Sequence, residues 1–178
     1  LRAGWPQDPI SSEIIPLTQL IELNRHYASS EIILMNISTA KGAELLRNSL
    51  EKPSSTVGWW HLIKDSSSLS MTDFGWRVLP SIGSYIDRKK LIECLFDRTI
   101  TAVAVNSVGI SGEQSKLPPD QRPAGLTGHQ LVLATLWEEL VIREGWDIEL
   151  LWEVLSFAPS RMLGLHEERL QIESNRWL

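Results

Sequence analysis

Short continuous apolar runs alternate with amphipathic stretches along the chain, and this alternation predicts an order of strands and helices. The runs at 32–35 and 100–105 contain β-branched residues, which is typical of strands buried on both faces of a parallel sheet. The apolar stretch at 56–62 predicts another strand, and a shorter one is expected at 76–79, just before Pro80.

Amphipathic stretches separate these runs and predict helices. The first helix is expected to begin at Ser11 or Ser12 and to carry Pro16 in its first turn, where a missing N–H is tolerated. The residues suited to cap the later helices are Ser38 or Thr39 and then Asp87.

The repeated order of strand and helix predicts an α/β fold with a parallel sheet. In α/β barrels, functional residues project from the carboxyl ends of the strands. A complete (β/α)8 barrel takes about 250 residues, whereas this chain has 178. We therefore expect one domain, 1–178, that makes up about half of such a barrel and is a piece of a longer polypeptide.

Composition narrows the classes of function. The chain has 17 Lys and Arg against 22 Asp and Glu, a net charge of −5, which argues against nonspecific binding to nucleic acid. Its apolar runs are far shorter than the roughly 20 residues that cross a membrane. The single cysteine, Cys94, excludes an internal disulfide and favours a reducing compartment, so a cytoplasmic location is expected.

The predicted strand ends carry unusual residues for a catalytic site: Asn36, Trp60, Leu79 and Asn106. Neutral amides, an indole and an isobutyl group cannot hold a catalytic divalent cation tightly. His61 is the one histidine at a strand end. We favour a core histidine over a metal ligand there, because a ligand needs partners that converge with it.

Taken in order, these segments resemble the C-terminal half of a type I dihydroorotase, in the amidohydrolase superfamily. Asn36-Ile-Ser-Thr-Ala40 is similar to the family's His-(Ile/Val)-Ser-Thr-(Ala/Lys), and Trp59-Trp-His-Leu62 stands where Pro-His-His-Leu is usual. Arg77-Val-Leu-Pro-Ser-Ile-Gly83 is similar to Lys-Val-Asn-Pro-Pro-Leu-Arg. The segments 99–110, 123–128 and 156–165 match the frames of the last strand, the substrate loop and the closing motif. The resemblance implies strands five to eight of a (β/α)8 TIM barrel of the metallo-dependent hydrolase type.

The resemblance also locates the changes in chemistry. Metal-ligand histidines of the fifth and sixth strands stand at Asn36 and Trp60, and His61, the neighbour of Trp60, is the only remaining ligand candidate. The aspartate that binds metal and acts as general base stands at Asn106, where an amide cannot take up a proton. The substrate-loop positions implied by the resemblance are Leu79, Gly83, Ile110, Pro123 and Gly125.

The resemblance therefore implies a dihydroorotase-like protein of the pyrimidine biosynthesis type that is catalytically inactive. We expect it to need no cofactor, whereas active members use zinc, and to act as a scaffold for aspartate carbamoyltransferase or to self-associate. The alternative is an active zinc-dependent dihydroorotase, a cyclic amide hydrolase, that uses ligands outside this chain or His61. A third possibility is a pocket that still binds a small molecule, made more apolar by Trp59, Trp60 and Leu79.

Half a barrel leaves strand edges and apolar interior positions uncovered. Residues 1–178 alone are therefore expected to aggregate or self-associate, and a sharply two-state, monomeric unfolding transition would count against the half-barrel assignment.

Overall fold

A parallel sheet of three short strands lies at the centre of the computed structural model, which describes residues 8–27, 31–70, 74–118, 121–126 and 128–165. The strands are β1 (Ile33–Leu34), β2 (Ser54–Gly58) and β3 (Ala102–Ala104), in the spatial order β1-β2-β3. β1 pairs with the first half of β2 and β3 pairs with the second half, both in parallel. The predicted α/β class with a parallel sheet is confirmed.

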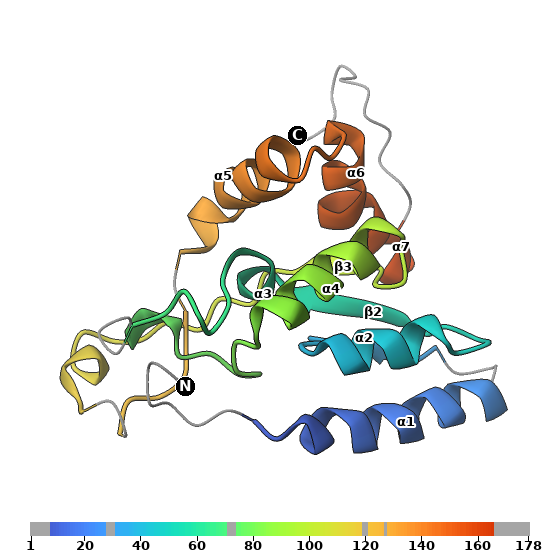
Figure 1. Cartoon of the computed structure of the whole chain (residues 1–178), viewed down its shortest axis with the longest axis horizontal. Coiled ribbons are helices and arrows are strands. Elements are labelled where there is room, and N and C mark those ends of the chain that lie inside the picture. Colours follow the sequence, from blue (N-terminus) through green and yellow to red (C-terminus); the bar gives the residue numbers. More distant parts are fainter. Residues whose placement is uncertain (1–7, 28–30, 71–73, 119–120, 127, 166–178) are drawn as a thin grey trace.

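Helices connect and cover the strands. The longer ones are α1 (Ile10–His26), α2 (Ala40–Arg47) and α4 (Tyr85–Phe96); the shorter ones are α3 (Trp59–Ile63), α5 (Val132–Leu136), α6 (Ile148–Trp152) and α7 (Ala158–Met162). Single 3-10 turns lie at Phe74–Trp76, Gln114–Lys116 and His129–Leu131, and π-helical turns extend α5 over Trp137–Arg143 and α6 over Glu153–Phe157. In Figure 1, α1 and α2 lie side by side below β2, and α5, α6 and α7 lie on the opposite side.

The helix caps follow the predicted chemistry with one correction. Thr39 caps α2, because its hydroxyl accepts a hydrogen bond from the backbone N–H of Gly42 at 3.0 Å. The cap of α4 is Ser84 and not Asp87. Asp87 stands three residues later and accepts from the backbone N–H of Ser84 at 2.8 Å, so the two residues form a capping box.

The strand predicted at 56–62 ends early. Sheet pairing stops at Gly58, opposite Ala104, and the next five residues form α3 instead of continuing the strand. Once the pairing ends, backbone groups need other partners, and the helical turn supplies them. Trp59 to Leu62 are all buried in this turn, so their unbroken apolar pattern reflects a buried helix.

The segment 76–79 is not a strand in the structure. A 3-10 turn ends at Trp76, and the residues that follow pair with neither β2 nor β3, which bond directly to each other. The resemblance had implied a strand between them. Since β2 and β3 already use their facing edges on one another, the sheet has no edge at that place for residues 76–79.

One face of β1 is open, contrary to the predicted burial on both faces. Leu34 is buried, but Ile33 is 36% exposed and Met35 is 66% exposed. The first helix also begins earlier than predicted, at Ile10, so Pro16 lies inside α1. The helix continues through it because the carbonyl that loses its donor belongs to Ser12, which is exposed to water.

The core lies between the sheet and the helices. Its fully buried members come from β2, from α2 to α6 with the π-helical turns, and from the approach to β3. They include Leu46, Val57, Leu62, Leu91, Leu95, Ile100, Leu136, Leu140 and Leu151. In the part of the chain that the structure describes, the longest apolar helical stretch falls short of a membrane crossing.

Candidate functional site

Asn36 and Asn106, which stand at two positions where the resemblance implies metal chemistry, meet in the structure. Asn36 follows β1 and Asn106 follows β3, so both lie at the carboxyl edge of the sheet. Nδ2 of Asn106 donates a hydrogen bond to Oδ1 of Asn36 over 2.9 Å. Asn36 has a φ of 60°, in the left-handed region that asparagine tolerates better than most residues.

The amide pair does not fit a zinc ion. A zinc site needs three or four His, Cys, Asp or Glu side chains that converge on one point. Among the described residues, no three such side chains lie close enough together to hold a metal ion. Oδ1 of Asn36 is engaged by its neighbour, and the amide nitrogen of Asn106 offers no lone pair. This chain therefore contributes a neutral hydrogen bond where the resemblance implies a ligand set.

A double-mutant cycle will test this pair. Asn36→Ala and Asn106→Ala are each expected to destabilise the fold by about 1–2 kcal/mol, because each leaves the partner amide half-buried without its hydrogen bond. The double variant is expected to cost about 1 kcal/mol less than the sum. Urea unfolding measures all four proteins, and strictly additive losses would show that the two amides do not interact.

Trp60 and His61 are buried within α3. Trp60 is 3% exposed and packs edge-on against Trp59, with 6.3 Å between ring centroids. His61 is 2% exposed, and its Nε2–H donates to the carbonyl oxygen of Ser81 at 3.3 Å. Within the described residues Nδ1 of His61 has no hydrogen-bond partner. His61 thus has the surroundings of a core histidine, as the sequence favoured.

The protonation of His61 follows from this burial. Removal from water lowers its pKa from 6.5 to about 4, and backbone carbonyls, with the charge of Asp87, offset only part of that effect. The imidazole is therefore neutral at pH 7. A neutral ring is what metal ligation needs, but the convergent acidic or thiolate partners are not found among the described residues.

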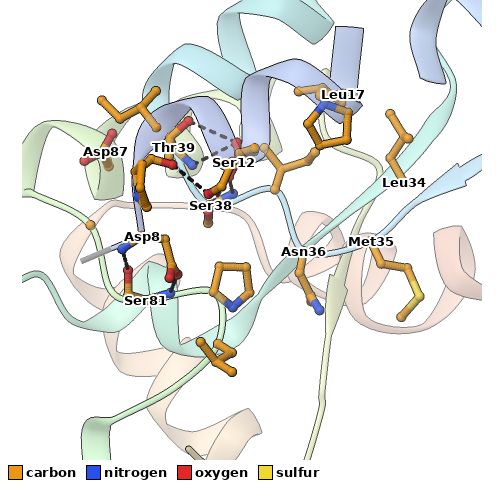
Figure 2. Close-up of a pocket in the computed structure, with 18 of the residues that line it drawn as sticks. Asp8, Ser12, Leu17, Leu34, Met35, Asn36, Ser38, Thr39, Ser81 and Asp87 are labelled. Atoms are coloured by element: carbon orange, nitrogen blue, oxygen red, sulfur yellow. Dashed lines mark hydrogen bonds between the residues drawn. The ribbon is translucent and has the colours of Figure 1, made fainter. Parts of the chain in front are cut away.

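A pocket of about 810 Å³ lies beside Asn36, between α1, β1 and the loop before α4. We call it the α1–β1 pocket. Three positions singled out from the sequence line it: Asn36, Leu79 and Gly83. Figure 2 shows Asn36 and Met35 side by side, just after the end of β1. Trp59 and Trp60, expected to make a retained pocket more apolar, are not among its described lining residues. Trp59 instead borders a smaller pocket with Trp76.

Two carboxylates from distant segments close the amino end of α2 at the floor of this pocket. Glu13 of α1 accepts hydrogen bonds from the backbone N–H groups of Ser38, at 3.0 Å, and Thr39, at 3.3 Å, and from both hydroxyls. Asp87 of α4 accepts from the backbone N–H of Ala40 at 2.8 Å. The backbone N–H groups of Ser38, Thr39 and Ala40 are thereby satisfied within the chain. Figure 2 shows Ser38 and Thr39 with hydrogen bonds to the residues around them.

Neither carboxylate was predicted to belong to the site, although the sequence held one clue. In a capping box, Glu or Gln stands three residues after the cap and accepts from the cap's own N–H. Here Gly42 stands at that position, after Thr39. The cap residue therefore needs an acceptor from elsewhere, but the pattern does not say that it is Glu13.

Gly83, at the family's arginine position, packs tightly against Asp87. A Cβ atom at Gly83 would lie 2.8 Å from both Cβ and Oδ2 of Asp87. A side chain at 83 would therefore force Asp87 away from the amino end of α2. An arginine, which the resemblance implies at this position, would meet the same obstacle.

The other substrate-loop positions lie together, but they do not line the α1–β1 pocket. Gly125 donates its backbone N–H to the carbonyl of Arg77 at 2.8 Å. A Cβ at Gly125 would meet the carbonyl oxygen of Val108 at 2.8 Å and Cγ1 of Ile110 at 3.0 Å, so only glycine fits. Pro123 is exposed nearby in sequence. Ile110 and Gly125 thus hold the loop after β3 against the segment that contains Arg77.

Comparisons with known proteins identify the region. No protein-family model matches the chain. It is 32% identical over 178 residues to a probable dihydroorotase-like protein of Synechocystis sp., across 94% of this chain and 40% of that protein. It is 25% identical over 170 residues to a dihydroorotase of Thermus aquaticus, across 91% and 40% of the two chains. Among solved structures, an L-hydantoinase (dihydropyrimidinase) of Arthrobacter aurescens superposes with a TM-score of 0.77 at 19% identity, across 91% and 39%.

The chain spans about 40% of the length of the curated relatives it matches. The structural likeness gives the fold alone, and that fold is part of a TIM barrel of the amidohydrolase type, as predicted. The similar sequences are named as dihydroorotases or dihydroorotase-like. The chain is therefore a partial dihydroorotase-like region, built on part of an amidohydrolase barrel.

Proposed function

We propose that this region is part of a protein of the pyrimidine-biosynthesis dihydroorotase type that has lost hydrolysis and serves as a scaffold. The hydrogen bond between Asn106 and Asn36 carries the proposal. Hydrolysis of a cyclic amide needs a base that takes a proton from the attacking water. The amide of Asn106 has no basic lone pair, and its N–H is turned toward Asn36.

The residues at the implied substrate-contact positions support the same proposal. Dihydroorotate is an anion, and the resemblance implies an asparagine and an arginine that contact it. Leu79 and Gly83 stand at those positions, and the described lining of the α1–β1 pocket contains no Lys, Arg or His. An anionic substrate would lose its cationic contact and meet the carboxylates of Asp8, Glu13 and Asp87 instead.

The proposed partner is aspartate carbamoyltransferase, which the resemblance implies. Exposed apolar side chains near the carboxyl ends of β1 and β3 support a surface that further protein covers, either the rest of the barrel or a partner: Met35 is 66% and Val105 is 45% exposed. Self-association would cover the same positions. Size-exclusion chromatography of the full polypeptide, with and without the carbamoyltransferase, separates the two outcomes.

The test of lost hydrolysis is turnover of dihydroorotate by the full polypeptide in zinc-containing buffer. We expect no turnover above the buffer rate, and co-elution with aspartate carbamoyltransferase. Turnover that a chelator abolishes would contradict the loss of hydrolysis and identify an active zinc enzyme. Elution apart from the carbamoyltransferase, with its activity unchanged, would contradict the scaffold role.

A further inference from the structure

The α1–β1 pocket has the size and walls of a small-molecule site. Its volume of about 810 Å³ lies within the range of about 300–1,000 Å³ that ligand pockets occupy. Much of its wall is aliphatic, formed by side chains from α1, from β1 and from the loop before α4: Ile10, Leu17, Leu20, Leu34, Met35 and Leu79. Figure 2 shows Leu17, Leu34 and Met35 along one side, facing the polar groups at the start of α2.

The charged side chains in the described lining of the pocket are all carboxylates. Asp8, Glu13 and Asp87 line it, and its described lining residues include no cationic side chain. Asp8 accepts from the backbone N–H of Ser81 at 2.7 Å, and the other two carboxylates accept from N–H and hydroxyl groups. Neutral donors satisfy hydrogen-bonding capacity without cancelling charge. The amino end of α2 offsets only about half an elementary charge, so the pocket stays negative.

Leu79 and Gly83 both make the pocket less suited to an anionic ligand. Leu79 is apolar where the resemblance implies an asparagine, and Gly83 removes a cation where it implies an arginine. The close approach of Asp87 to Gly83 keeps that cation out. Leu79 offers an apolar contact where the resemblance implies an amide, and Gly83 offers no cation to a carboxylate ligand.

We propose that the α1–β1 pocket binds a small organic ammonium ion with an apolar body. The ammonium group sits against Asp8 at the exposed rim, and the apolar body contacts Leu79 and Met35. The inference rests on the proposed function only in that the pocket no longer serves an anionic substrate. The proposal is reversible binding, with no covalent step.

The test compares three probes that share one ring and differ in head charge: phenethylammonium, 2-phenylethanol and phenylacetate. Ligand-observed NMR titration of the full chain measures each dissociation constant. We expect phenethylammonium to bind at least about tenfold more tightly than phenylacetate, with the alcohol between them. Equal binding of all three, tighter binding of phenylacetate, or no binding of phenethylammonium at millimolar concentration would overturn the proposal.

Variants locate the site. Asp8→Asn keeps an oxygen that can accept from the N–H of Ser81, and it is expected to weaken phenethylammonium binding severalfold. Leu79→Lys is expected to abolish binding. Both substitutions make the charge of the rim more positive, which repels the ammonium group. Glu51→Gln, at an exposed residue outside the described lining, is the matched control and should leave binding unchanged. Equal effects of Asp8→Asn and Glu51→Gln would overturn the assignment. Failure here leaves dihydroorotate turnover untouched, so the two proposals fail separately.

Discussion

Replacing Arg88 with methionine is expected to destabilise the fold by about 3–5 kcal/mol, because it removes the cation that two buried carboxylates share. Among the described residues, Glu139 then keeps only its ion pair with the largely exposed Arg143, at 3.2 Å. The Arg88 guanidinium lies 3.4 Å from Oδ2 of Asp65 and forms an ion pair with Glu139. Both acids are buried, at 6% and 7% exposure. The three residues come from the loop just after α3, from α4 and from the π-helical turn after α5, so the cluster ties distant parts of the chain together.

Methionine keeps most of the volume of Arg88 and removes its charge and its N–H donors, one of which bonds the carbonyl oxygen of Leu62 at 3.3 Å. The loss therefore reports the polar interactions of the guanidinium and not a cavity. Urea unfolding at pH 7 measures it. The matched control is Arg25→Met, which breaks an exposed pair with Glu22 and should cost less than about 1 kcal/mol. Equal losses for Arg88→Met and Arg25→Met would contradict the buried cluster.

Lowering the pH is expected to destabilise the protein through His61. Burial holds the pKa of His61 at about 4 in the folded chain, against about 6.5 when it is unfolded. Between these values the unfolded chain takes up a proton that the folded chain refuses. The contribution of His61 to stability is therefore fully present above about pH 6.5 and is lost as the pH falls to about 4, a change of about 3 kcal/mol.

The variant His61→Phe isolates this contribution, because a phenyl ring keeps the packing against Trp60 and does not titrate. The free energy of unfolding is measured for both proteins at several pH values between 7 and 4. We expect the wild type to lose about 3 kcal/mol more than the variant over that range. Parallel curves would mean that His61 is protonated as easily in the folded chain as in the unfolded one.

The sequence predicted the parts of the fold that depend on local pattern. The apolar runs at 32–35 and 100–105 contain β1 and β3. The Ser38-Thr39 pair precedes α2, because a hydroxyl side chain just before a helix can accept a hydrogen bond from its first turn. The sequence placed Asn36 and Asn106 at the carboxyl ends of two strands, but it did not predict that they meet. Their contact depends on β3 pairing directly with β2, where another strand was expected at 76–79.

Other features depend on long-range contacts that a local pattern does not contain. The apolar run at 56–62 is compatible with a strand or a buried helix, and the end of pairing at Gly58 decides between them. Glu13 and Asp87 reach α2 from 25 and 47 residues away along the chain. The apolar side chain of Met35 predicts burial, but Met35 is exposed in the structure. Its exposure depends on which elements the described chain places beside β1, and the local sequence does not contain that information.

The central claim is that this region supplies neutral amides at the rim of its barrel, and that its described residues contain no set of metal ligands there. The most direct test is the zinc content of the full polypeptide, purified in zinc-supplemented buffer and measured by atomic emission. We predict about zero zinc ions per chain, because Asn36 and Asn106 bond to each other and His61 lies buried in α3. One or more tightly held zinc ions per chain, lost in the double variant Asn36→Ala and Asn106→Ala, would contradict the claim.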